Sequence, residues 1–312
     1  MTAATALVQN KFQDPLVTAD GKIRATVSLI SLDTLWINTG TLCNLTCKNC
    51  YIESSPKNDN LVYITAEEVA NYLDEIQNNN LGTTEIGFTG GEPFMNPDLL
   101  LMLDDALSRG FKVMVLTNAM KPMLKKACDL EQIGERFRDQ ITIRVSLDHY
   151  TKEGHESERG ERSWDSALSG LSWLNDRNFN INIAGRTFID EEEATARSGY
   201  EKLFTDLSLS IDAHDPTELV LFPEMVASLD IPEITNECWS ILDVHPDSVM
   251  CATSRMVVKR KGAPAPAVIA CTLLPYEDEF EMGSTLASSA RDVSLCHPHC
   301  ARFCVLGGAT CS

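Results

Sequence analysis

Three cysteines lie within eight positions of the segment TGTLCNLTCKNC: Cys43, Cys47 and Cys50, spaced C-x3-C-x2-C. A structural zinc ion takes four ligands and a disulfide takes two, so three clustered thiols suit neither. A [4Fe–4S] cluster normally takes four thiolates, one for each iron, and three would leave one iron open to an outside chelator. The spacing alone leaves half of a zinc ribbon, or a structural cluster with a remote fourth ligand, as competing interpretations.

The cysteines are numerous and unevenly placed. The chain has 312 residues and 11 cysteines, of which seven fall in its last quarter: Cys238, Cys251, Cys271, Cys296, Cys300, Cys304 and Cys311. The first residues, MTAATALVQNKFQDP, have neither a basic nor an apolar region of the kind a secretory signal needs, and no apolar run reaches about 18 residues. We therefore expect a cytoplasmic protein without a membrane span, whose cysteines serve metals or redox chemistry rather than disulfides.

Charge excludes one class of partner. The net charge is −19, from 26 basic and 45 acidic side chains, and this balance opposes nucleic-acid binding, which draws on the neutralisation of phosphates. The local basic cluster Lys259-Arg260-Lys261 is expected at the tip of a hairpin.

The elements that must position the cysteines follow an alternating pattern. Thr65 and Glu68 form a predicted capping box ahead of an apolar stripe, and Pro97 and Gly110 bracket another helix. Six apolar strands are predicted at 35–40, 84–88, 111–118, 141–148, 179–188 and 217–222, and helices at 65–79, 97–110, 123–134, 163–178 and 190–208. This alternation predicts an α/β fold with a parallel sheet and outer helices. Because a closed barrel needs eight units, we expect an open, partial barrel.

Unusual residues recur where the predicted strands end. The cysteine loop follows the first strand and Gly90-Gly91-Glu92-Pro93 follows the second, while Asn118, Ser146, Asp148 and Arg186 lie at the ends of the next three. Chemistry in parallel α/β folds lies at the C-terminal ends of strands, so these residues are expected to share one rim.

The constellation resembles the radical S-adenosylmethionine (radical SAM) superfamily, whose hallmark is C-x3-C-x2-C after the first strand of a partial (β/α)6 barrel. The resemblance covers about residues 30–225 and includes GGEP after the second strand and SLD on the fourth. The stretch HESERGERSWDSALSGLSWL, residues 155–174, looks like the branch with C-terminal auxiliary clusters of the SPASM and twitch type.

The resemblance implies a cofactor and a reaction. Cys43, Cys47 and Cys50 would hold three irons of a [4Fe–4S] cluster, and SAM would chelate the fourth. One electron would cleave SAM to a 5′-deoxyadenosyl radical, which abstracts hydrogen from the substrate. A reductant such as flavodoxin or ferredoxin is the implied partner.

The same resemblance suggests roles for residues at the rim. Gly90 and Gly91 would let the backbone approach SAM, Glu92 would accept from its ammonium group, and Pro93 would fix the turn. Ser146 and Asp148 match positions that contact the SAM carboxylate and ribose, with strand-end capping as the alternative. Asn118 and Arg186 are further candidates, against plain polar roles at the core edge. The family usually has an aromatic residue before the third cysteine, where this chain has Asn49, so an adenine contact from this loop is left open.

For four further residues we expect structural roles. His149, His155 and Glu156 are expected in a solvated loop, and Cys128 is expected in the core of a helix.

The C-terminal cysteines resemble an auxiliary-cluster motif in part. Cys251 and Cys271 flank a predicted hairpin that contains Gly262, and FEMG follows at 280–283. The second half, CHPHCARFCVLGGATC, has the spacing C-x3-C-x3-C-x6-C, which departs from the usual arrangement. We expect Cys251, Cys271, Cys300 and Cys304 to form the core ligand set of at least one more cluster. Cys296 and Cys311 are competitors or ligands of a second cluster, Cys238 is a distal candidate, and a zinc knuckle aided by His297 and His299 is the alternative.

These expectations define three regions and several functions. An N-terminal arm would cover 1–24, the barrel 25–225 and the auxiliary-cluster domain 226–312. The leading hypothesis is a radical SAM enzyme that makes an oxidative modification or a bond on a small metabolite or peptide; residues 1–24 are too short for a leader-peptide-binding domain, which tilts the expectation toward small substrates. The alternatives are a biosynthetic enzyme acting on a nucleotide or sugar, and a non-enzymatic Fe–S electron carrier or zinc protein.

Overall fold

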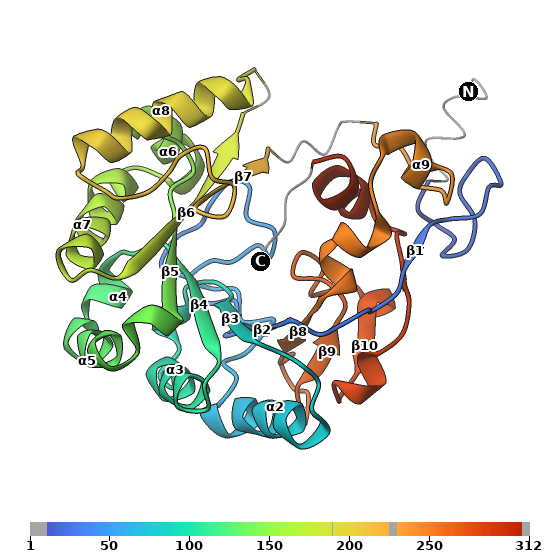
Figure 1. Ribbon diagram of the computed structural model, residues 1–312, viewed down its shortest axis with the longest axis horizontal. Coiled ribbons are helices and arrows are strands. Elements are labelled where there is room, and N and C mark those ends of the chain that lie inside the picture. The colour runs from blue at the N-terminus through green and yellow to red at the C-terminus, as the bar shows by residue number, and fades with distance from the viewer. Residues whose placement is uncertain (1–10, 189, 225–229, 308–312) are drawn as a thin grey trace.

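The central feature of the fold is one large twisted sheet (Figure 1). A computed structural model describes residues 11–188, 190–224 and 230–307. In these residues the sheet has nine strands in the order β10-β9-β8-β2-β3-β4-β5-β6-β7. The six strands from β2 to β7 are parallel to their neighbours and are β2 (Thr34–Asn38), β3 (Glu85–Thr89), β4 (Lys112–Thr117), β5 (Ile141–Ser146), β6 (Asn180–Thr187) and β7 (Leu219–Pro223). The predicted parallel α/β partial barrel is confirmed.

Helices cover the outside of this curved sheet (Figure 1). They are α2 (Ala66–Asn79), α3 (Leu99–Ser108), α4 (Lys121–Leu124), α5 (Ala127–Phe137), α6 (Lys152–Arg159), α7 (Ser163–Asp176) and α8 (Glu193–Asp206). The predicted capping box is present, because Thr65 accepts from the Glu68 N–H and Glu68 accepts from the Thr65 N–H. The helix predicted at 123–134 is divided into α4 and α5, and α6 was not predicted.

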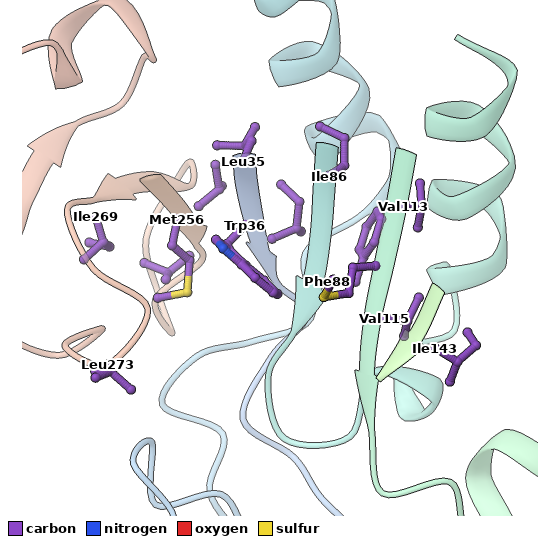
Figure 2. Packing of buried hydrophobic residues seen from close by; sticks show 14 of the residues in the cluster. Leu35, Trp36, Ile86, Phe88, Val113, Val115, Ile143, Met256, Ile269 and Leu273 are labelled. Atoms are coloured by element: carbon purple, nitrogen blue, oxygen red, sulfur yellow. The ribbon is translucent and has the colours of Figure 1, made fainter. Parts of the chain in front are cut away.

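The sheet and the helices that cover it form one hydrophobic core (Figure 2). Leu35, Ile86, Phe88 and Val115 are fully buried. Trp36 crosses the face of β3 at Gly87, where an added Cβ would lie 2.4 Å from the indole ring. This close packing fixes the strands, and therefore the loops that follow their C-terminal ends.

The C-terminal region extends the same sheet. Strand β8 (Ser254–Val258) pairs parallel with β2, with Thr34 opposite Ser254, and β9 (Ala267–Ile269) returns antiparallel to β8. The predicted hairpin is confirmed, and its basic tip is ion-paired, since Lys259 contacts Glu68. Strand β10 (Glu281–Gly283) completes this edge. The region after residue 225 thus joins the barrel through continuous strand pairing.

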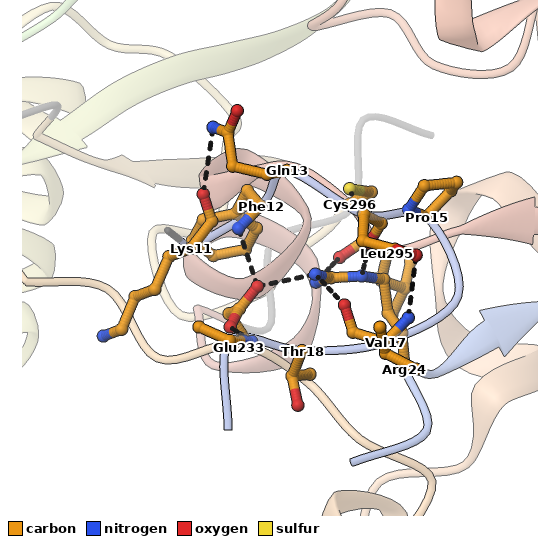
Figure 3. A network of polar contacts seen from close by, with 12 residues as sticks. Lys11, Phe12, Gln13, Pro15, Val17, Thr18, Arg24, Glu233, Leu295 and Cys296 are labelled. Carbon is orange, nitrogen blue, oxygen red and sulfur yellow. Dashed lines mark hydrogen bonds and ion pairs between the residues drawn. The ribbon is translucent and has the colours of Figure 1, made fainter. Parts of the chain in front are cut away.

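The N-terminal arm packs on the C-terminal region. Strand β1 (Thr26–Val27) pairs with β11 (Val293–Ser294), far from it in sequence. The buried Arg24 guanidinium lies 2.6 Å from Glu233 and donates to the Val17 carbonyl at 3.0 Å (Figure 3). An ion pair of this kind, together with its hydrogen bonds, fixes the arm in place.

Short helices complete the described chain. They are α9 (Cys238–Leu242), the π-helix η7 (Cys300–Val305) and the 3-10 turns η1 (Pro93–Met95), η2 (Arg138–Gln140), η3 (Pro246–Ser248), η4 (Met250–Ala252), η5 (Asp278–Phe280) and η6 (Ala287–Ser289). Within the described ranges, every helix is too short or too polar to cross a bilayer.

Candidate functional site

The three clustered cysteines lie at the C-terminal rim of the barrel. Cys43, Cys47 and Cys50 occupy the loop after β2 and line one cavity. The same cavity is lined by residues at the ends of β3 to β6: Gly90, Gly91, Asn118, Ser146, Asp148 and Arg186. The tertiary structure therefore brings together all the predicted cofactor-binding residues of the barrel except Glu92 and Pro93.

Backbone N–H groups are directed at two of the sulfurs. The Leu45 N–H donates to Cys43 Sγ at 3.4 Å, and the Ser54 N–H donates to Cys50 Sγ at 3.3 Å. Such donors stabilise the negative charge of a thiolate ligand. Burial raises the pKa of Cys43 to about 12. A cation must therefore displace the thiol proton when it binds, which couples cluster loading to proton release.

An ion-pair network forms the opposite wall of the cavity. Asp148 Oδ2 lies 2.8 Å from Arg159 Nε, and Asp148 Oδ1 lies 3.5 Å from Arg186 Nε. Burial opposes ionisation of Asp148, but the two guanidinium groups outweigh it and lower its pKa. One negative carboxylate, Asp148, is thus shared by two positive guanidinium groups, Arg159 and Arg186. The three side chains together have a net positive charge.

Arg186 also restrains the cysteine loop. Its guanidinium donates to the Asn49 carbonyl at 2.9 Å and lies 5.2 Å from the centre of the Tyr51 ring. The Asn49 side chain in turn donates to Glu158 at 2.7 Å. Strand β6 and helix α6 therefore hold the two residues on either side of Cys50, and Asn49 serves this contact in the position where an aromatic residue is usual.

The two glycines pack against the cysteine loop. A Cβ on Gly90 would lie 2.6 Å from the Gly40 carbonyl oxygen, and one on Gly91 would lie 2.3 Å from that of Leu42. The Gly90 φ of +137° is a further reason for glycine there. These glycines were expected to let the backbone approach a ligand. They also let the loop after β3 approach the cysteine loop.

Glu92 and Pro93 lie behind the cavity wall. Glu92 is 1% exposed, and it accepts from Thr117 Oγ1 at 2.8 Å, from the Asn118 N–H at 2.9 Å and from the Phe94 N–H at 3.1 Å. Burial raises the pKa of this carboxyl despite these bonds. Its contacts are with protein groups at the end of β4, and Pro93 begins the buried turn η1.

Two expectations about neighbouring residues were wrong. Cys128 lies in helix α5 as expected, but its side chain is exposed rather than in the core. His149, His155 and Glu156 were expected in a solvated loop, but His149 and His155 are buried, and both His155 and Glu156 belong to α6.

Helix α6 also supplies the residue that sequence reasoning missed. Arg159, at the end of this helix, lines the cavity and contacts Asp148. Thr151 caps the helix by accepting from the Gly154 N–H at 3.2 Å, and Gly160 follows its last residue. A Thr-x-x-Gly start and a following glycine are short, weak patterns that could have predicted the helix, but they do not specify which way its arginine points.

A second cavity collects cysteines of the C-terminal region. Cys251, Cys271, Cys300 and Cys304 line it together with His299. Burial raises the pKa of Cys300 well above its usual range, and the nearby Cys271 and Cys251 act in the same direction. These four thiols, brought from η4, the end of β9 and η7, fit the donor set of a cubane cluster.

The remaining C-terminal cysteines are placed elsewhere. Cys296 contacts the Asp14 carbonyl at 3.4 Å on the side of the N-terminal arm (Figure 3), and Cys238 contacts the Thr235 N–H at 3.4 Å. Cys311 lies outside the described residues.

Within the described ranges, no group of three or more His, Cys, Asp or Glu side chains converges on a point that could hold a single metal ion.

Comparison with known proteins identifies related chains. The family model described as the radical SAM superfamily matches residues 37–197. The antilisterial bacteriocin subtilosin biosynthesis protein AlbA of Bacillus subtilis is 33% identical over 147 residues, which cover 47% of this chain and 31% of that protein. The mycofactocin maturase MftC of Mycobacterium tuberculosis is 30% identical over 132 residues, covering 42% and 32%. The matches span about a third of the length of these curated relatives.

The fold has counterparts among solved structures. That of anSMEcpe with bound AdoMet superposes with a TM-score of 0.57 at 16% identity, and the match covers 82% of this chain and 79% of that one. The similarity extends beyond the barrel, because the covered share exceeds that of the family model.

Proposed function

Because the chain belongs to the radical SAM superfamily, we propose that it cleaves SAM reductively and uses the resulting radical for an oxidative modification of a peptide. The observation that carries this proposal is the shared cavity, in which Cys43, Cys47 and Cys50 face the strand-end residues of β3 to β6. Cys43, Cys47 and Cys50 would hold a cluster there, and that cluster would supply the electron for the reductive cleavage of SAM.

The residues of the cavity bind and orient the cofactor in this proposal. Gly90 and Gly91 line the cavity beside the cysteine loop and have no side chains, so a ligand can lie against their backbone. The Asp148 carboxylate can accept hydrogen bonds from a hydroxyl or ammonium group of SAM, and the net positive charge of Asp148, Arg159 and Arg186 together suits the carboxylate of SAM. Asn118 and Ser146 add polar contacts on the same wall.

The second cysteine cavity is proposed to hold an auxiliary cluster. Cys251, Cys271, Cys300 and Cys304 would be its four ligands. Leu273 lines both this cavity and the SAM cavity, so the two sites share a wall. An electron left on a substrate radical would therefore have a short path to this cluster, which favours an oxidative outcome. Flavodoxin or ferredoxin is the proposed source of the first electron.

A peptide is the proposed substrate because of what the relatives do. One relative serves bacteriocin biosynthesis and another is a maturase of mycofactocin. A short precursor peptide encoded beside the gene would be the first substrate to test, and mass spectrometry would show the loss of hydrogen that an oxidation requires.

The central test is the release of 5′-deoxyadenosine. Anaerobically reconstituted protein, given dithionite and SAM, should release it, and the variant with Cys43, Cys47 and Cys50 all replaced by Ala should not. Cys128→Ala is the matched control, because Cys128 is exposed on α5 and should be dispensable. Release of 5′-deoxyadenosine by the triple variant would disprove the assignment of these three ligands.

Iron content tests the auxiliary cluster separately. Wild type should hold about eight irons per chain, and the triple variant about four, because each cubane contains four. An iron-free triple variant, or zinc in anaerobically purified protein, would show that the second cavity does not hold a cluster.

A further inference from the structure

We propose that His299 donates an N–H hydrogen bond to a sulfur of the cluster in the second cavity and thereby raises its reduction potential. This proposal rests on the auxiliary cluster of the proposed function. His299 lines the cavity together with the four thiols, and it immediately precedes η7, which carries Cys300 and Cys304. The rest of the lining is apolar or sulfur-containing, with Val249, Leu295 and Phe280 among its members. Among the lining side chains the imidazole is therefore the one with an N–H group, beside the backbone N–H of Leu273, which donates to Cys271 Sγ at 3.4 Å.

The ring of His299 is held by packing and has hydrogen-bonding capacity to spare. It lies edge-on to Phe303, with ring centres 5.5 Å apart, and edge-on to His297 at 4.5 Å. In the described part of the chain, neither of its ring nitrogens has a hydrogen-bond partner. A neutral imidazole has one N–H donor and one acceptor, so the ring can donate to a further group.

The number of cysteines in the cavity favours His299 as a hydrogen-bond donor to the cluster over His299 as a ligand of an iron. A cubane has four irons, and four cysteines already line the cavity, so no iron requires the imidazole. Hydrogen bonds to cluster sulfurs are one of the main determinants of reduction potential. They stabilise the more negative, reduced form, so the cluster becomes easier to reduce.

His297 provides a matched control within the same sequence. Its Nδ1 accepts the backbone N–H of His299 at 3.1 Å, its ring lies edge-on to Phe280, and it does not line the cavity. Replacing either histidine by Phe removes an imidazole from the same segment, but only His299→Phe removes a ring that lines the cavity.

The test measures the second cluster alone. In the full-length variant lacking Cys43, Cys47 and Cys50, a potentiometric titration followed by electron paramagnetic resonance gives the midpoint potential of the remaining cluster. His299→Phe should shift this potential to more negative values, and His297→Phe should leave it unchanged. His299→Gln keeps an N–H donor and should retain part of the difference. An exchangeable proton coupled to the reduced cluster should disappear in His299→Phe.

Several outcomes would overturn the proposal. An unchanged midpoint in His299→Phe with full iron content would show that His299 does not act on the cluster. Strong nitrogen coupling, or loss of iron in both His299 variants but not in His297→Phe, would make His299 a ligand instead of a donor. By contrast, a cluster-free parent variant would contradict the auxiliary cluster itself, whatever the role of His299.

Discussion

Glu92 shows that some polar residues at the barrel rim stabilise the fold, whereas others line the cofactor cavity. The GGEP sequence predicts a carboxylate that faces the SAM ammonium group, whereas Glu92 is buried behind the cavity wall and accepts from Thr117, Asn118 and Phe94. Arg159, in contrast, was not anticipated and lies in the cavity beside Asp148. A side chain's role here follows from which side of the cavity wall it occupies.

Glu92→Gln should therefore destabilise the fold. The amide would place an NH2 group where a carboxylate oxygen now accepts from backbone N–H donors. Leaving one such donor unpaired costs about 1–3 kcal/mol in the free energy of unfolding. Denaturant unfolding at neutral pH measures this cost, and the exposed Glu161→Gln is the control. Unchanged stability together with lost SAM binding would instead assign Glu92 a direct contact with SAM.

At the scale of elements, the N-terminal arm depends on one buried carboxylate. Glu233 accepts from the backbone N–H groups of Phe12 and Ala19, each at 2.7 Å, and pairs with Arg24 (Figure 3). Burial opposes its ionisation, but these hydrogen bonds and Arg24 outweigh it and lower its pKa. The charge of Glu233 therefore stabilises the docked arm.

Loss of this charge should loosen the arm. Glu233→Gln is expected to speed amide hydrogen exchange in residues 11–24. Glu237→Gln is the control and should leave exchange unchanged, because the Glu237 side chain is exposed and lies 3.5 Å from Lys22. Because the folded pKa of Glu233 is depressed, its contribution is complete above the unfolded value of about 4.3 and is lost as pH falls through the folded pKa. After correction for intrinsic rates, wild type should lose protection on acidification and Glu233→Gln should not. A pH-independent arm in wild type would contradict this account.

At the scale of the whole molecule, the C-terminal region and the barrel share one sheet. Strand β8 pairs with β2 over residues 34–37 and 254–257, and Met256 packs beside Trp36 in the common core (Figure 2). Two regions joined by continuous strand pairing and a common core should unfold together.

Met256→Ala tests this coupling. Removal of a fully buried side chain should cost roughly 2–5 kcal/mol. Hydrogen exchange in denaturant should then show β2 and β8 losing protection together. Ile241→Ala, at a position that is 75% exposed in the C-terminal region, should change stability by less than about 0.5 kcal/mol. Loss of protection in β8 well before β2 would show that the two regions are independent.

The sequence by itself determined the features that depend on neighbouring residues. Apolar segments predicted six strands and most of the helices, because the buried face of each element repeats along the sequence with the period of a strand or a helix. The capping box at Thr65 was predictable because its two residues are only three positions apart. The cysteine spacing, together with GGEP and SLD at the ends of later strands, indicated the family, because each of these motifs is a short local pattern.

Only the tertiary structure decided which distant residues meet. The parallel pairing of β8 with β2 and the inward position of Arg159 both join segments far apart in the chain. No local pattern specifies such contacts, because they depend on how whole elements pack and on which faces they bury. For the same reason Cys128 was misplaced: the helix was readable, but which of its faces the core would cover was not.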